Sequence, residues 1–485
     1  MSTQEPQYQA PANGWRTFLI VWGTQSVSVF GSALTWFAIT IWLTQTLYAR
    51  PEQKPELAFA LTILGLTYII TLMVAPFAGA WADRHDRKHT MMTVDFILGV
   101  QSLVLMTLLL TSSLQLWMLL LLVAVEQLFA PFHYSAFDTS YAMLVPEERL
   151  ARANGMMQTI FSLSSILSPA IAASIIALPS LARQGLVPGV FGDWLAPLKD
   201  GAALAIGVDA VTFFLASGIL LFLTIPSPKR ADLQADGTDG KKKSVWADIK
   251  EGAMYIKRRP PLLWLLATFT VINFASSPVE LFVPLLLKFN LAGDWQSHGF
   301  TFESALALLS MLGGIGGVVG GVIMSAWGGL KRKRVYGVVV PILIAAAVQI
   351  VYGLSPYFFL TCGTMFFLIG LIPIMNSHSQ TIWQSQVPRE LQGRVFSVRR
   401  VIAQFSAPVS TLLAGLASAQ FNPGVILAIL GTITVVFCIA QLFNPYLLKV
   451  ENKQFLDELA TQRGEPLALA MTTAEAQIPP TLLEQ

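Results

Sequence analysis

The chain has 485 residues, of which 54% are hydrophobic and 12% are charged, with a formal net charge of +3, whereas about 25% of the residues of an average soluble protein are charged. This composition excludes a soluble globular protein and predicts a polytopic membrane protein. The net charge of +3 gives no support to nucleic-acid binding. The lysine and arginine residues gather in the loops on one side of the spans, as expected for a membrane protein.

Twelve apolar stretches recur along the chain, and each is long enough for a helix to cross the hydrocarbon core of a bilayer. Transmembrane strands would show short segments of alternating hydrophobicity instead, so we predict an all-α membrane protein. The first stretch is too long for a signal-peptide core and is expected to remain as an anchor. The predicted spans are residues 16–47, 57–82, 90–111, 114–141, 155–178, 202–225, 262–288, 303–329, 335–354, 357–384, 395–419 and 424–448.

Lysine and arginine are distributed unevenly between the two sides of these spans. The side of the N-terminus carries 26 of them, and the other side carries five. Those five are Arg50, Lys54, Arg183, Lys199 and Lys288. Because positively charged loops stay in the cytoplasm, both termini are predicted to be cytoplasmic, in a multi-pass protein of the plasma (inner) membrane.

The two halves of the chain repeat one another. VPEERLAR at 145–152 is echoed by VPRELQGR at 387–394, and the same offset aligns Pro131 with Pro373 and Gly79 with Gly321. The two copies are 242 positions apart in the sequence. This distance contains six spans, an even number, so the two halves are predicted to have the same orientation in the membrane, as parallel repeats. The predicted domains are an N-terminal tail (1–14), a six-helix bundle (15–225), a central cytoplasmic loop (226–261), a second six-helix bundle (262–448) and a C-terminal tail (449–485).

The central loop is the longest polar segment between spans. Its part rich in Asp, Gly and Lys is expected to be disordered. Towards its end, Trp246, Ile249, Ala253 and Ile256 recur at helical spacing and predict a short helix. Two interpretations remain open for this helix, which either lies on the cytoplasmic lipid surface or is an ordinary solvated linker.

The loop after the second span carries the motif Gly79-x-x-x-Asp83-Arg84-x-x-Arg87-Lys88. Together with the six-plus-six spans and the long central loop, this motif resembles the major facilitator superfamily over essentially the whole chain. The usual loop in that family is G-x-x-x-D-R-x-G-R-[RK], and Asp86 here replaces its inner glycine. Within the family, LQGRVFSVRRVIAQFSAP at 391–408 resembles the branch of macrolide-efflux proteins and the enterobactin exporter. The resemblance implies the major facilitator fold.

The resemblance also implies that this motif belongs to a cytoplasmic gate. The carboxylate of Asp83 is expected to meet the positive N-terminal end of a helix, which in the family is the eleventh span, beginning near Arg394. The alternative is a loop of solvated charges that only anchors the topology. The predicted gate residues are Gly79, Asp83, Arg84, Arg87, Lys88 and Arg394.

Polar side chains inside the spans concentrate in the first, fourth, seventh and tenth. Such side chains are costly in a membrane and usually face a cavity, and the resemblance places these four spans around a central cavity. Aromatic side chains in the same spans suit a bulky amphipathic solute, although each taken singly is more often a packing residue. The predicted cavity residues are Gln25, Ser28, Ser32, Trp36, Tyr134, Asn273, Asn376, Gln380 and Gln384.

Three titratable residues in these spans are predicted to couple proton movement. Glu126 lies near the middle of its span, where a carboxyl group withdrawn from water can take up a proton reversibly. His133 titrates in a useful range and is predicted to relay the proton, although a lone histidine is more often a packed hydrogen-bonding group. Glu280 is predicted at the outer mouth. Asp95 and Asp209 are also intramembrane, but a helix–helix hydrogen bond explains either as readily.

The sequence therefore predicts a secondary active transporter, with proton-coupled efflux of a hydrophobic or amphipathic small molecule, such as a drug, macrolide or siderophore, by alternating access. The alternatives are an importer or a lysolipid flippase on the same scaffold, and more remotely a membrane sensor. The chain is not expected to be an enzyme, because no H-E-x-x-H, G-x-S-x-G or Walker motif occurs. We expect a monomer among membrane lipids, without cofactor or metal, and the glycine run at 313–321 is interpreted as helix packing.

Overall fold

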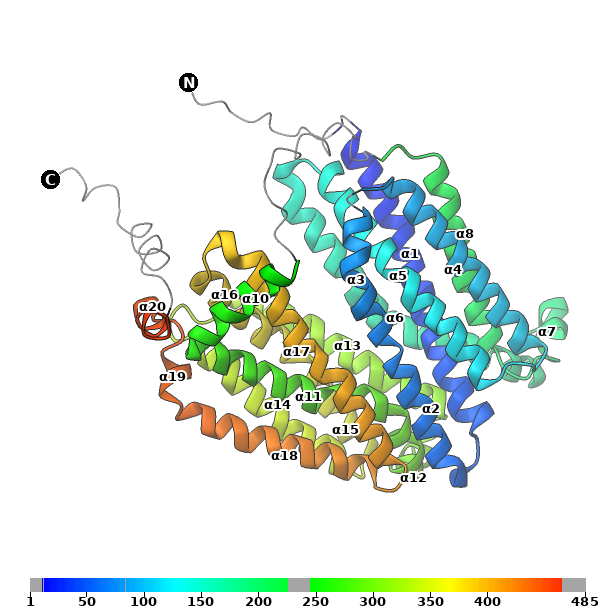
Figure 1. The fold of residues 1–485 in the computed structure, drawn as a ribbon. Helices are drawn as coiled ribbons and strands as arrows, with labels where there is room; N and C mark the ends of the chain where they lie inside the picture. The colour runs from blue at the N-terminus through cyan, green and yellow to red at the C-terminus, as the bar shows by residue number, and fades with distance from the viewer. Residues whose placement is uncertain (1–10, 12, 83, 226–244, 465–485) are drawn as a thin grey trace. The chain divides into compact units, whose positions relative to one another are not determined.

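The computed structural model describes all residues except 1–10, 12, 83, 226–244 and 465–485. The regular elements of the described residues are helices, shown in Figure 1. Twelve helical segments among them are long and apolar enough to cross a membrane, which confirms the predicted spans.

The spans are built from the following helices, in chain order: α1 (Gly14–Ile41) continued by a π-helical turn η1 (Trp42–Leu47), α2 (Lys54–Leu66) with α3 (Tyr68–Ala82), α4 (Arg87–Leu110), α5 (Leu116–Leu144), α6 (Leu150–Arg183), α8 (Ala202–Leu221), α11 (Pro260–Phe289), α13 (Phe302–Trp327), α14 (Tyr336–Leu354), α15 (Phe358–Gly370) with α16 (Ile372–Gln386), α17 (Arg389–Ser418) and α18 (Pro423–Leu442). Between and after them lie the short elements η2 (Pro51–Gln53), η3 (Glu147–Arg149), α7 (Gly189–Leu195), α10 (Val245–Arg258), α12 (Ala292–Ser297), α19 (Pro445–Leu448) and α20 (Lys453–Gln462).

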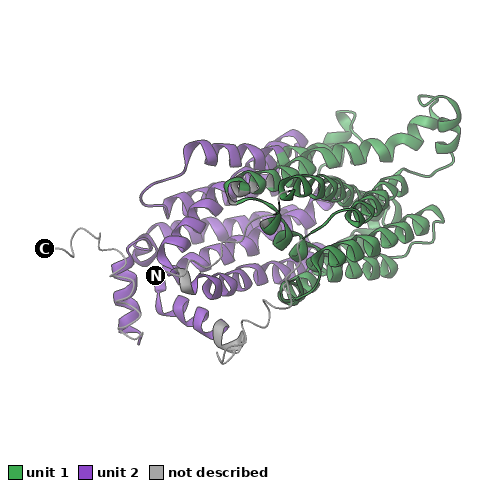
Figure 2. Cartoon of the chain, turned by 90° about the horizontal axis from the view of Figure 1, so that it is seen from above, with its two compact units in different colours: residues 1–240, 287–314 green, residues 241–286, 315–485 purple. Residues whose placement is uncertain are grey.

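The chain forms two compact units, drawn in green and purple in Figure 2. Unit 1 contains residues 1–240 and 287–314, and unit 2 contains residues 241–286 and 315–485. Within unit 1, α8 packs along both α1 and α4, and α5 packs against α3 and α4. Within unit 2, α14 packs along α18 and touches α15 and α16, while α10 packs on α17.

Within the glycine run at 313–321, Gly316 and Gly320 bring α13 into backbone contact with α15. A Cβ atom added to Gly316 would lie 2.0 Å from the carbonyl oxygen of Phe366, and one added to Gly320 would lie 1.9 Å from that of Gly370. No larger side chain fits at either position, so the contact of α13 with α15 requires glycine at both. This contact is the one that the packing interpretation of the run predicts.

The helix at the end of the central loop, α10, packs on α17 within unit 2. A Cβ atom at Gly252 would lie 2.7 Å from the carbonyl oxygen of Arg394, so glycine permits this close approach. On either side, Arg394 Nη1 donates to Glu251 Oε2 at 2.8 Å, and the Tyr255 hydroxyl donates to the carbonyl of Gln386 at 2.8 Å. The structure therefore favours a third interpretation over the two left open by the sequence: α10 braces the start of α17.

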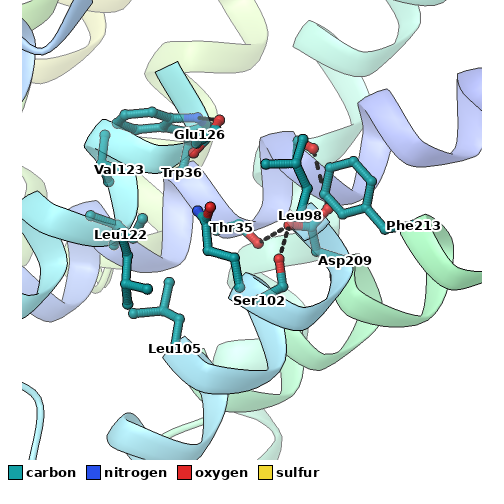
Figure 3. A pocket seen from close by; sticks show the side chains of 13 residues that line it. Thr35, Trp36, Leu98, Ser102, Leu105, Leu122, Val123, Glu126, Asp209 and Phe213 are labelled. Carbon is teal, nitrogen blue, oxygen red and sulfur yellow. Dashed lines mark hydrogen bonds between the residues drawn. The ribbon is translucent and has the colours of Figure 1, made fainter. Parts of the chain in front are cut away.

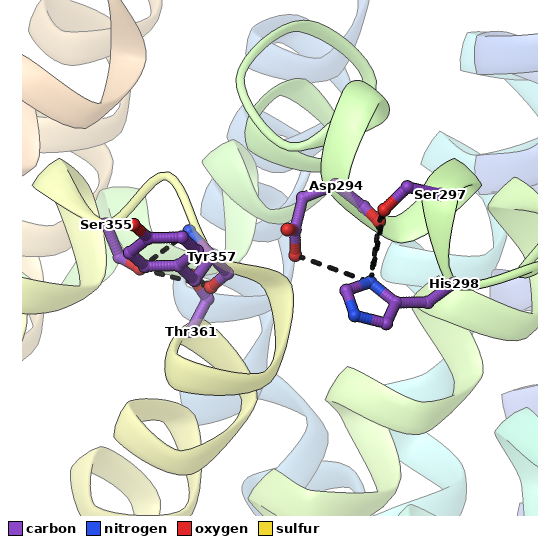
Figure 4. A network of polar contacts seen from close by, with 6 residues as sticks. All are labelled: Asp294, Ser297, His298, Ser355, Tyr357 and Thr361. Atoms are coloured by element: carbon purple, nitrogen blue, oxygen red, sulfur yellow. Dashed lines mark hydrogen bonds and ion pairs between the residues drawn. The ribbon is translucent and has the colours of Figure 1, made fainter.

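Two loops at the ends predicted to face outward are closed by local polar contacts, shown in Figure 4. In unit 1, His298 Nδ1 lies 2.8 Å from the carbonyl oxygen of Asp294, at the end of α12. In unit 2, Ser355 Oγ accepts from the backbone N–H of Tyr357 at 3.1 Å, and Thr361 Oγ1 donates to the carbonyl of Tyr357 at 2.9 Å. The bond to Ser355 satisfies the backbone N–H of Tyr357 just before α15, a group that has no partner within the helix.

Candidate functional site

A buried cluster of three polar side chains joins α1, α4 and α5 in unit 1. Asp95 is fully buried on α4, and its Oδ2 accepts a hydrogen bond from Gln25 Nε2 of α1 at 3.1 Å. Its other oxygen, Oδ1, lies 3.1 Å from Nε2 of His133 on α5, which is also buried. A lone carboxylate would be very costly at such a position. The hydrogen bond from Gln25 compensates for part of that cost, and the His133 ring lies beside the second oxygen.

A second buried carboxylate, Asp209 of α8, is held by hydroxyl groups from two neighbouring helices. On α1, Thr35 donates to Oδ2 at 2.8 Å and Ser32 donates to Oδ1 at 3.2 Å. On α4, Ser102 donates to Oδ2 at 3.1 Å. Gly31 allows the approach, because a Cβ atom there would lie 2.9 Å from Asp209 Oδ1. Three donors therefore stabilise one carboxylate at the contact of α1, α4 and α8, as Figure 3 shows.

Glu126 of α5 lies at the same small cavity as Asp209. Its Oε1 accepts a hydrogen bond from Trp36 Nε1 of α1 at 3.3 Å. The side chains of Glu126, Asp209, Gln101 and Trp36 all line the cavity, together with apolar residues of α4 and α5 (Figure 3). Its volume of about 10 Å³ corresponds to room for about one water molecule. Two carboxyl groups thus share one polar space within unit 1.

Unit 1 therefore brings together Glu126, His133, Gln25, Ser32 and Trp36 of the predicted site. The remaining predicted residues of this unit lie on the same two helices. Ser28 is buried on α1, between the levels of Gln25 and Ser32, and the side chain of Tyr134 on α5 is about half exposed.

The predicted cavity residues of unit 2 do not form a comparable cluster. Asn273 Nδ2 donates to the carbonyl of Ala403 at 3.0 Å, which ties α11 to α17. Asn376 and Gln384 are exposed on α16. Glu280 is an exposed residue of α11, and the structure gives it no place in a polar cluster of the described residues.

Arg399 of α17 is a cation inside a membrane span that the sequence analysis did not select. Its Nη1 donates to Gln380 Oε1 at 2.9 Å, and its guanidinium group lies 5.1 Å from the centre of the Trp383 ring. The face of Phe269 lies 6.0 Å away. The sequence alone could have indicated Arg399, because an arginine within an otherwise apolar span is rare and usually functional.

Comparison with known proteins gives the family of the chain. The sequence model of the Major Facilitator Superfamily matches residues 21–411. The chain belongs to this superfamily. It is thus a transporter rather than an enzyme, embedded in a membrane by multiple spans and acting on a small-molecule substrate.

Curated relatives in this superfamily agree with the resemblance read from the sequence. The chain is 24% identical over 435 residues to macrolide efflux protein A of Streptococcus pyogenes, covering 88% of this chain and 95% of that protein. It is 24% identical over 357 residues to the protein of the same name from Enterococcus faecalis, covering 73% of this chain and 98% of that protein. The narrower resemblance to macrolide-efflux proteins is confirmed.

Solved structures of transporters support the same fold. The nucleoside transporter NupG aligns with a TM-score of 0.62 at 12% identity, over 87% of this chain and 98% of that one. A bacterial homologue of the human lysosomal transporter Spinster aligns with a TM-score of 0.60 at 14% identity, over 97% of this chain and 100% of that one. At these identities the likeness concerns the fold alone, and it confirms the predicted major facilitator fold.

The motif loop of this transporter is held by Arg87 and Asp86. Arg87 is buried at the start of α4 and donates to the carbonyls of Ala82 and Thr139, each at 3.2 Å. Asp86, which replaces the usual inner glycine, accepts from the backbone N–H of His89 at 2.8 Å and so caps α4. The departure from the family motif therefore supplies an N-cap in place of a flexible turn.

The other predicted gate residues of the transporter occupy different surroundings. Lys88 Nζ donates to the carbonyl of Leu221 at the end of α8, at 2.9 Å. Arg84 is exposed, and Gly79 lies within α3 with open space beside it. Arg394 belongs to unit 2, where it pairs with Glu251. Asp83 lies outside the described residues.

Proposed function

We propose that the chain is a secondary active exporter that couples efflux of a hydrophobic or amphipathic small molecule to proton movement. The relatives named macrolide efflux protein A support the direction of transport and the class of solute. The buried carboxyl groups of unit 1 support the choice of the proton as the coupling ion, because intramembrane acids commonly form proton pathways.

One observation carries this proposal: a single face of α1 donates to carboxylates on three other helices. Gln25 donates to Asp95 of α4, Thr35 and Ser32 donate to Asp209 of α8, and Trp36 donates to Glu126 of α5. A protonated carboxyl group accepts a weaker hydrogen bond than a carboxylate does. Gain or loss of a proton at any of the three acids therefore changes what holds α1 in place.

Within the proposal, Glu126 and His133 bind or relay the proton, and Glu280 stays a candidate at the outer mouth. His133 gains a partner in Asp95, so the relay consists of an acid–imidazole pair rather than a lone ring. Asp209 becomes a further candidate, because it shares its cavity with Glu126.

For substrate binding, the proposed residues remain those predicted on α1, α5, α11 and α16. Tyr134, Asn376 and Gln384 present exposed side chains that a solute can reach. Gln25 and Ser32 already donate to carboxylates of unit 1. The first group thus suits direct contact with a solute, and the second suits coupling to the proton.

The gate residues remain a proposal for alternating access between two six-helix bundles, 15–225 and 262–448. Gly79, Asp83, Arg84, Arg87, Lys88 and Arg394 form this proposed gate. The bonds of Arg87 to both Ala82 and Thr139 support it, because they fasten the motif loop to the end of α5. Cytoplasmic termini in a plasma (inner) membrane, an ion gradient as energy source and a monomeric state belong to the same proposal.

Transport into everted membrane vesicles tests the function. Vesicles with and without the protein receive a panel of macrolides, amphipathic dyes and lysolipids, and an imposed pH gradient is later collapsed with nigericin. We expect uptake of at least one macrolide or dye that requires the protein and is lost with the gradient. Uptake that is the same with and without protein, or that persists after collapse, would contradict proton-coupled efflux, and uptake of lysolipids alone would favour the flippase.

A further inference from the structure

A cavity of about 360 Å³ lies in unit 1, at the ends of the helices that are predicted to face outward. Its walls come from three separate segments: the π-helical turn η1, the turn between α4 and α5, and the loop between α7 and α8. Ligand pockets in proteins span about 300–1,000 Å³. This one is far larger than the space beside Glu126 and is separate from it.

The lining of the cavity has an apolar side and a charged side. Trp42, Leu47, Leu110 and Leu114 form much of the apolar side. Lys199 and Asp200 lie together on the charged side. Leu110 is about half exposed as well as lining the cavity, so the apolar side continues to the outer surface of α4.

The charged pair is positioned by specific contacts. The guanidinium group of Arg183 donates to the carbonyls of Leu198, at 2.6 Å, and of Lys199, at 3.4 Å, which fixes the course of this loop. Asp200 Oδ1 accepts from the backbone N–H of Ala202 at 2.9 Å. Within the described residues, neither the ammonium group of Lys199 nor Oδ2 of Asp200 makes a hydrogen bond or an ion pair, and Lys199 is exposed.

Two backbone features shape the same cavity. The π-helical turn Trp42–Leu47 is wider than an α-helical turn and supplies three lining residues. Ser112, which also lines the cavity, has a φ angle of +53°, in the left-handed region. Both conformations are uncommon in proteins as a whole, and where they occur they are frequently found at functional sites.

The neighbouring surface indicates that the cavity lies at the level of lipid headgroups. Directly before the loop, α7 exposes Val190, Phe191 and Trp194, with the two rings 6.2 Å apart. Trp117, at the start of α5, is exposed as well. Exposed tryptophan at the ends of spans, as at Trp117 and Trp194, is typical of the interface between water and hydrocarbon.

We propose that this cavity binds the headgroup of a zwitterionic phospholipid of the outer leaflet, with its phosphate at Lys199, its ammonium group at Asp200 and its acyl chains leaving along Leu110. A lysine and an aspartate side by side complement a phosphate and an ammonium group that are joined by a short linker. A purely anionic headgroup would meet the carboxylate of Asp200, and a lipid without phosphate would leave Lys199 unmatched. The inference depends on the predicted orientation but not on the transported solute.

Lipid binding to the full chain in mild detergent tests the proposal, with native mass spectrometry counting the lipids retained. The probes are dioleoyl phosphatidylethanolamine, dioleoyl phosphatidylglycerol and dioleoylglycerol, which has no phosphate. We expect the zwitterionic lipid to be retained about threefold better than the anionic one, as for a partly exposed charge contact, and dioleoylglycerol least of all.

Variants separate this site from general lipid contact. Lys199→Gln is expected to lower retention of the zwitterionic lipid about threefold, whereas Arg50→Gln, which removes another exposed cation of the same face, leaves it unchanged. Asp200→Asn keeps the acceptor for Ala202 and is expected to narrow the difference between zwitterionic and anionic lipids. Ala203→Met fills the cavity without changing charge and is expected to lower retention of every lipid.

Three results would overturn the proposal. Equal retention by the Lys199 and Arg50 variants would show that the charged pair is not the site. Unchanged lipid preference in Asp200→Asn decides against it even where the Lys199 variant is poorly folded. Soluble glycerophosphoethanolamine is added as a competitor of the retained lipid. If it displaces that lipid as strongly as added whole lipid does, the occupant of the cavity is not a membrane lipid.

Discussion

Replacing Asp209 by alanine tests whether the contact of α1, α4 and α8 depends on one carboxylate. This side chain is 3% exposed and accepts hydrogen bonds from Thr35, Ser32 and Ser102. Alanine leaves these three hydroxyl groups without their acceptor inside the bundle, beside a cavity with room for about one water molecule. We therefore expect a large loss of stability, although the change removes only a small side chain.

The magnitude follows from the number of hydroxyl groups. A buried polar group that loses its partner costs about 1–3 kcal/mol, and a serine or threonine in a helix recovers part of this by bonding to a carbonyl of the preceding turn. If each of the three hydroxyl groups costs about 1 kcal/mol, the lower limit of this range, Asp209→Ala lowers the free energy of unfolding by about 3 kcal/mol. Asp209→Asn keeps one carbonyl oxygen and is expected to cost about 1–2 kcal/mol.

Unfolding of the purified protein, followed by helical circular dichroism in mixed micelles of rising dodecyl sulfate content, measures these differences. Ser102→Ala serves as the matched control, because it removes one donor and leaves the carboxylate with two, at a cost of about 1 kcal/mol. If Asp209→Ala and Ser102→Ala destabilise equally, the carboxylate does not organise the contact. The inference that α1 responds to its charge then fails too.

Three further variants test separate parts of the account. Glu126→Gln is expected to abolish gradient-driven uptake into vesicles while downhill exchange persists, and unchanged pumping removes Glu126 from the coupling role. Asp83→Asn is expected to lower turnover in proteoliposomes without changing the order of preferred solutes, since it alters the proposed gate and not the cavity; normal turnover favours the solvated anchor. Arg399→Gln is expected to change the free energy of unfolding by less than about 1 kcal/mol, because the lost contacts with Trp383 and Gln380 are offset by the lost cost of burying a charge. A loss of several kcal/mol in a dodecyl sulfate titration would indicate an unrecognised acidic partner.

The sequence predicted the membrane architecture well because hydrocarbon imposes one strong rule. Every backbone polar group in the membrane core must be satisfied within its own segment, so apolar length alone identifies spanning helices. The break in the tenth span was less accessible. It lies at Leu371, two residues before Pro373, which has no N–H group to continue the ladder of α15.

A single sequence does not show which side chains on different helices contact one another. His133 and Asp95 are 38 positions apart, and nothing in their spacing indicates that their side chains meet at 3.1 Å. The polar stripe of α1 was visible at helical spacing, but its role depends on what packs against it. Sequence reasoning gave Gln25 and Ser32 to the substrate cavity, whereas the structure shows them donating to Asp95 and Asp209.

Asp95, Asp209 and Glu126, the carboxyl groups that α1 contacts, differ in how many acceptor positions remain free, and this difference favours one of them as the exchangeable acid. A carboxylate offers about four acceptor positions. Asp209 fills three with hydroxyl groups, and Asp95 receives Gln25 and faces His133. Among the described residues, Glu126 receives a hydrogen bond from Trp36 alone. Glu126 is thus the acid best able to take either a proton or a cationic group of a solute.

A proton and the ammonium group of a solute compete for such a carboxylate, because it cannot hold both at once. This competition is sufficient to produce antiport. Under the proposed function we therefore expect a cationic amphiphile to be exchanged for protons, and a neutral analogue of the same shape to cross without moving them. Fluorescence of a pH dye trapped in proteoliposomes measures this difference directly. Equal proton movement with the cationic and the neutral compound would show that Glu126 does not couple by direct competition, even where Glu126→Gln abolishes transport.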